Sequence, residues 1–75
     1  MTALDVRFRY GRPPGEAAMR ALQAAREVYG VRRIRLEATN STVCVEYDAS
    51  RLNQAAVEAL LLQAGLDLQE RIAQV

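Results

Sequence analysis

The side chains that could do chemistry in this chain of 75 residues are few. Cys44 is the single thiol, and the chain has no histidine, which is the commonest general base and metal ligand in proteins. The nine carboxylates show no convincing catalytic pair, and Ser41 and Ser50 have no basic partner in the sequence. We therefore predict that the chain is not an enzyme.

Cys44 allows two interpretations. A thiolate can bind a soft ion such as Cu(I), or Zn(II), but metal sites normally need several ligands, so Cys44 would have to act across a dimer. The simpler interpretation is a small, half-exposed residue in a strand. We favour that one, and we expect no bound cofactor.

Arginine accounts for all ten basic residues, and four of them recur in two alternating segments. Arg7 and Arg9 lie in one segment and Arg33 and Arg35 in another, which predicts a basic face with Arg12 at its rim. Such a face could bind an anion, a nucleic acid or an acidic protein surface. The net charge is only +1 and no aromatic residues accompany the arginines for base stacking. We therefore do not expect a nucleic acid partner.

A candidate docking surface combines Tyr10, Leu62 and Leu66 with Arg12. Leu62 falls off the main apolar face of a predicted helix, and clustered exposed apolar residues mark protein contacts. The partner would be another protein or a second copy of the chain.

Four segments have the pattern of strands. Residues 4–10, 31–37 and 42–47 alternate apolar and polar side chains, which is typical of half-buried strands. A last strand begins around Leu66 and Leu68 and loses its pattern toward Gln74 and Val75.

Two segments have the pattern of helices. Apolar residues recur at helical spacing over 18–28, and Gly30 is a natural stop. A second helix is expected from about residue 54 to 64, with Asn53 as its N-cap and Gly65 as its stop.

The order of these elements is strand, helix, strand, strand, helix, strand. It predicts an α+β fold, the ferredoxin-like βαββαβ sandwich, in which a four-stranded antiparallel sheet carries two helices on one face. Residues 1–75 would form a single domain. The four arginines and Cys44 would then lie on the open face of the sheet.

The location of the chain is also constrained. One cysteine cannot form an intramolecular disulfide, so the simplest setting is the reducing cytoplasm. The longest apolar run, residues 59–62, is far shorter than the ~20 residues that span a bilayer, so we expect no membrane insertion.

This frame resembles the heavy-metal-associated domain of copper chaperones and of the cytoplasmic tails of metal-pumping ATPases. The resemblance covers nearly the whole chain. Its matching points are the span from Gly11 to the Gly30-Val31 pair, Tyr47-Asp48 at the end of a strand, Asn53 as a cap, and Ala64-Gly65 where the family writes Ala-Gly-Tyr. Since the apolar phase of the first strand is one residue off the family pattern, we expect a bulge there.

The reactive positions of that family are absent. Its first helix follows a Gly-Met-x-Cys-x-x-Cys loop, and here Arg12 stands at the methionine position while Pro14 and Ala17 stand at the two cysteines. Leu66 replaces the aromatic or basic residue that the family often places beside the metal. The resemblance therefore implies the fold without the metal-binding cysteine pair. It implies a metallochaperone-like domain that acts through protein contacts or regulation.

Overall fold

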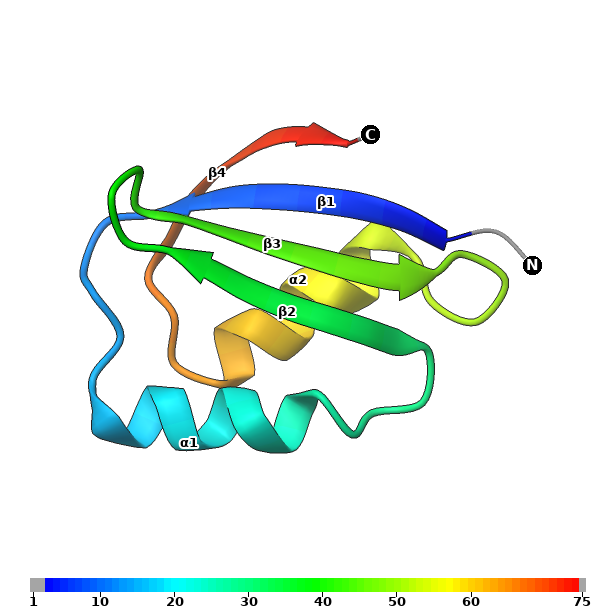
Figure 1. The fold of residues 1–75 in the computed structure, drawn as a ribbon, viewed down its shortest axis with the longest axis horizontal. Helices are drawn as coiled ribbons and strands as arrows, with labels where there is room; N and C mark the ends of the chain where they lie inside the picture. The colour runs from blue at the N-terminus through cyan, green and yellow to red at the C-terminus, as the bar shows by residue number, and fades with distance from the viewer. Residues whose placement is uncertain (1–2, 75) are drawn as a thin grey trace.

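The structure is a computed structural model that describes residues 3–74, and it has the predicted order of elements (Figure 1). The strands are β1 (Ala3–Tyr10), β2 (Val31–Glu37), β3 (Thr42–Asp48) and β4 (Leu68–Gln74). The helices are α1 (Glu16–Ala25) and α2 (Gln54–Gln63). Val75, which belongs to the predicted last strand, lies outside the described residues.

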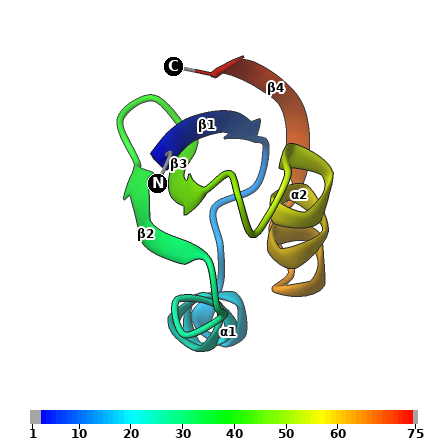
Figure 2. The ribbon, with the colours of Figure 1, turned by 90° about the vertical axis from the view of Figure 1, so that its right-hand side faces the viewer.

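The strands form one antiparallel sheet in the order β2-β3-β1-β4. Both helices lie against the same face of this sheet and leave the other face open (Figures 1 and 2). The predicted ferredoxin-like sandwich is confirmed.

The core lies between the sheet and the helices. Alternate residues of β1 point into it, so Val6, Phe8 and Tyr10 are buried. The central strand β3 behaves differently, because all of its residues except Glu46 are buried. The remaining core side chains are Leu22, Ala25, Ile34, Val57, Leu61, Ala64 and Leu66.

The two helices end differently from each other. A glycine with a φ of 101°, Gly65, follows α2 as predicted, and the Asn53 side chain accepts a hydrogen bond of 2.8 Å from the Ala56 amide at its start. The prediction that α1 runs to Gly30 is wrong, since it ends at Ala25. Tighter turns follow the helix, with backbone hydrogen bonds between residues three apart. These turns keep the apolar spacing close to helical as far as Val28.

The bulge expected in the first strand is not there, because β1 pairs with β3 residue by residue from Ala3 to Arg9. The irregularity lies where β1 pairs with β4. The register shifts between Arg7 and Phe8 and again between Arg9 and Tyr10. At both places the extra residue belongs to β4. The bulges are therefore in the edge strand and leave the apolar phase of β1 intact.

Leu61 and Leu62 provide a matched test of this core, because Leu61 is 1% exposed and its neighbour Leu62 is 51% exposed. We predict that Leu61→Ala lowers the free energy of unfolding by about 2–5 kcal/mol through the cavity it leaves. Leu62→Ala should change it by less than about 0.5 kcal/mol. Urea denaturation followed by circular dichroism measures both, and equal losses would contradict the helix orientation.

Asp48 anchors the turn that leads from β3 to α2. Its Oδ1 atom accepts hydrogen bonds from the Ser50 hydroxyl at 2.7 Å and from the Ser50 amide at 3.0 Å. These bonds hold the pKa of the Asp48 carboxyl below its usual range, and Arg51 adds a smaller effect in the same direction. Burial of Asp48 acts in the opposite direction and is outweighed.

Because the pKa of Asp48 is lower in the folded chain, its contribution to stability is present at neutral pH. This contribution is lost as the pH falls below about 4, where the unfolded chain takes up the proton first. Ser50→Ala should therefore lower the free energy of unfolding at pH 7 and make that free energy fall less steeply in acid. Urea titrations at several pH values, with Ser41→Ala as control, measure this. An unchanged acid profile would contradict the role of Ser50.

Candidate functional site

The loop from Gly11 to Gly15 and the first turn of α1 hold the positions where the family resemblance places two cysteines. Pro14 is half-buried before the helix, and Ala17 is exposed in the first turn. The Gly11 amide donates a hydrogen bond of 2.9 Å to the Asp67 carbonyl, which ties this loop to the segment before β4. Neither Pro14 nor Ala17 offers an atom that could bind a metal.

The predicted docking surface is not formed. Tyr10 and Leu66 are each only 4% exposed and belong to the core. Tyr10 continues the inward alternation of β1, and Leu66 turns inward directly after Gly65. Leu62 and Arg12 remain exposed, but without Tyr10 and Leu66 they do not make an apolar patch.

The open face of the sheet gathers most of the other predicted residues. The strand registers arrange its side chains in three rows that cross the strands. From β2 outward, the first row is Glu37, Thr42, Arg9 and Glu70, the middle row is Arg35, Cys44 and Arg7, and the third row is Arg33, Glu46 and Asp5.

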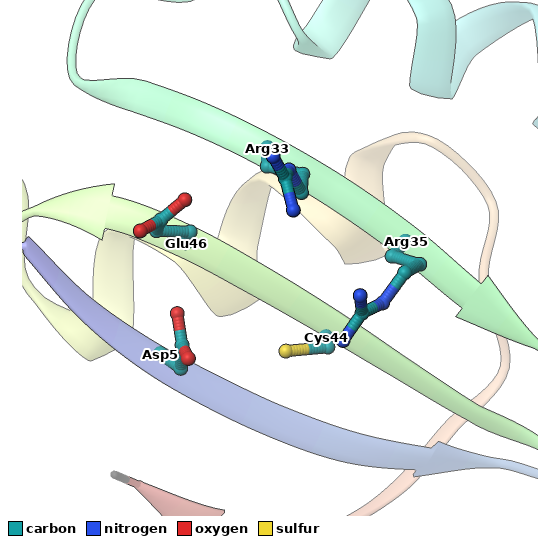
Figure 3. A pocket seen from close by; sticks show the side chains of 5 residues that line it. All are labelled: Asp5, Arg33, Arg35, Cys44 and Glu46. Atoms are coloured by element: carbon teal, nitrogen blue, oxygen red, sulfur yellow. The ribbon is translucent and has the colours of Figure 1, made fainter.

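A shallow depression of about 110 Å³ lies on this face between β2 and β1. Figure 3 shows its lining, with arginines from β2 on one side and Asp5 from β1 on the other. The lining residues are Asp5, Arg33, Arg35, Cys44 and Glu46.

Cys44 is 7% exposed, so the prediction of a half-exposed thiol is wrong. It does lie on the predicted face, but in the central strand, where Arg35 and Arg7 stand directly opposite it on the two neighbouring strands. The alkyl part of an arginine side chain commonly covers the surface beside it. We therefore expect the two arginines to shield the thiol from solvent.

The predicted basic face is electrically balanced. Its four arginines, Arg7, Arg9, Arg33 and Arg35, share the rows with the four carboxylates Asp5, Glu37, Glu46 and Glu70. Glu70 was not expected there, because the bulges of β4 set its register. Its Oε1 atom lies 2.8 Å from Nη1 of Arg9 and forms an ion pair. This balance weakens the case for a polyanionic ligand.

The surroundings of Cys44 do not favour a metal ion either. Across residues 3–74, no three His, Cys, Asp or Glu side chains come together closely enough to hold one. Cys44 shares its depression with Asp5 and Glu46, but also with two guanidinium groups that repel a cation. The described residues of a single chain therefore bring too few ligands together around Cys44 to hold a metal ion.

The sheet order and the placement of both helices define the ferredoxin-like class of fold found in heavy-metal-associated domains. Among solved structures, the chain is similar to the N-terminal domain of ZntA in the apo-form, with a TM-score of 0.68 and 22% sequence identity. The match covers 96% of this chain and 97% of that domain, and it confirms the fold that the resemblance implied. No family model and no curated protein gives a significant match.

Membrane insertion was not expected from the sequence. Between residues 3 and 74, neither helix combines the length and apolar character needed to cross a membrane.

The shielding of Cys44 can be measured with a neutral alkylating reagent such as N-ethylmaleimide. We predict slow reaction in the folded chain, rapid reaction in urea, and a several-fold faster folded-state reaction in Arg35→Ala, because reactivity follows exposure. Arg32→Ala removes the same charge from the same strand outside the three rows and is the control. Equal rates in the folded and unfolded chains would contradict the shielding.

Proposed function

We propose that the chain is a non-enzymatic heavy-metal-associated domain of the cytoplasm that acts by binding protein and does not carry metal on a thiolate pair. The observation that carries this proposal is a mismatch between fold and loop. The fold matches the ZntA domain over 96% of the chain, whereas Pro14 and Ala17 occupy the loop positions at which the family resemblance predicts cysteines.

The neighbour was solved in an apo-form. A chain that keeps such a fold can keep the protein contacts of a metal-handling system without the metal site. The loop before α1 supports a role in protein contact without metal binding. The Gly11 amide donates to the Asp67 carbonyl, so a contact within the chain holds one end of this loop.

A second candidate function is soft-metal binding through Cys44 across a dimer. The 7% exposure of Cys44 and the two guanidinium groups beside it oppose this alternative. Anion or nucleic acid binding by Arg7, Arg9, Arg33 and Arg35 is opposed by the equal number of carboxylates on the same face.

An anaerobic Cu(I) competition titration against a chromophoric chelator, with Zn(II) in parallel, tests the proposal. The native chain should take up neither ion. Pro14→Cys combined with Ala17→Cys should bind about one Cu(I) per chain, because it places two thiols three residues apart at a helix N-terminus.

Cys44→Ala in both backgrounds is the control for the native thiol. Binding of half a metal ion per native chain that Cys44→Ala abolishes would favour the dimeric metal site and overturn the proposal. Failure of the double cysteine variant to bind metal, with its fold retained, would show that the loop is not equivalent to the family's loop.

A further inference from the structure

Most charges of the open face have no ion-pair partner among residues 3–74. Among residues 3–74, the only ion pair on this face joins Arg9 to Glu70. Three arginines and three carboxylates of the rows therefore lack an ion-pair partner: Arg7, Arg33, Arg35, Asp5, Glu37 and Glu46. A surface with equal numbers of both signs does not attract a polymer of one sign, but it can fit a surface with a matching pattern.

We propose that this matching surface belongs to a second copy of the chain. The two open faces pack together about a two-fold axis that crosses the strands along the middle row. This proposal rests on the protein-binding role proposed above and names its partner.

The axis along the middle row brings the first row of one copy over the third row of the other. Each strand then lies over the same strand of the second copy. The facing pairs are Glu37 with Arg33, Arg9 with Asp5, and Thr42 with Glu46. Each pair occurs twice because the contact is symmetric. Arg9 already contacts Glu70, and because a guanidinium has five donors, it can donate to a second carboxylate as well.

A two-fold axis parallel to the strands and midway between β3 and β1 gives the opposite result. It places Glu37 over Glu70 and Glu46 over Asp5, and like charges at these positions repel. A parallel axis over β3 pairs Glu37 with Arg9 but sets Glu46 over Glu46 and Arg35 over Arg7. Exchanging the signs at positions 33 and 37 distinguishes that arrangement, because both new side chains would then face a like charge.

The middle row meets its own copy in the proposed dimer. Arg35 faces Arg35 and Arg7 faces Arg7, so the middle row opposes the contact. In the second copy, the rows on either side of each arginine hold one carboxylate and one arginine, and the attraction therefore comes from the outer rows. Stacked sheets lie about 10 Å apart, and a disulfide needs Cα atoms within about 7 Å. The dimer is therefore independent of a bond between the two Cys44 thiols.

The edges of the sheet are less suited to pairing with a second copy. On β2, Nη2 of Arg26 donates to the Ile34 carbonyl at 2.9 Å, so a backbone acceptor of this edge strand already has a partner. On β4, the bulges at Gln69 and Ile72 interrupt the regular spacing that a new strand would need. The face is therefore the better surface for self-association.

A charge swap tests the proposed contact. Analytical ultracentrifugation over a concentration series should give the native chain twice the mass of one 8.3 kDa chain. Arg33→Glu and Glu37→Arg should each raise the dimer Kd at least about tenfold, because each places like charges opposite one another twice. The combined R33E/E37R variant should restore the dimer, since it exchanges the two signs.

Arg32→Glu changes the charge of the same strand outside the rows and should leave the Kd unchanged, and Cys44→Ala should do the same. The native Kd should rise with added salt, which needs no variant. A monomer at every concentration would overturn the dimer, as would single swaps without effect or a double swap without rescue. None of these outcomes alters the metal titration, so the two proposals fail separately.

Discussion

Burial of the central strand is the constraint on which the rest of the fold depends. β3 lies between β2 and β1, and its apolar side, with Val43 and Val45, packs toward the helices. A chain this short buries a modest share of its surface, so the core must use both helices to cover one face of one sheet. On the other face, Arg35 and Arg7 stand opposite Cys44 on the neighbouring strands, and Cys44 is 7% exposed. The strand is thus buried toward the helices by packing, and little of it is accessible at Cys44 on the open face.

The loop before α1 is ordered by its backbone contacts and by proline. Gly15 caps the helix through its backbone without a side-chain bond, and Gly11 holds the loop against Asp67. Pro14 restricts the unfolded chain, which lowers the entropy lost on folding. Backbone geometry and proline stiffness therefore supply the order here.

The two edges of the sheet and its open face differ in how well they suit a contact with another chain. The Arg26 side chain, which donates to a carbonyl of β2, and the bulges of β4 limit strand addition at the two edges, which exposed edge strands otherwise permit. The open face instead carries equal numbers of both charges, and among residues 3–74 Arg9 and Glu70 form its one ion pair. Such a pattern fits a surface with a matching arrangement of charges better than a polyanion, which is the basis of the proposed contact with a second copy.

The sequence by itself determined the elements, because alternation in β1 and the caps at Asn53 and Gly65 are local signals that need no partner. It also determined which side of each strand is apolar, and hence the sandwich. The tertiary structure alone decided three other features. Burial of Cys44 depends on residues opposite it in other strands, the place of Glu70 on the open face depends on bulges that shift its register, and the early end of α1 depends on tighter turns that keep the helical spacing of apolar residues. Each depends on contacts between segments distant in the chain or on backbone geometry that periodicity does not encode.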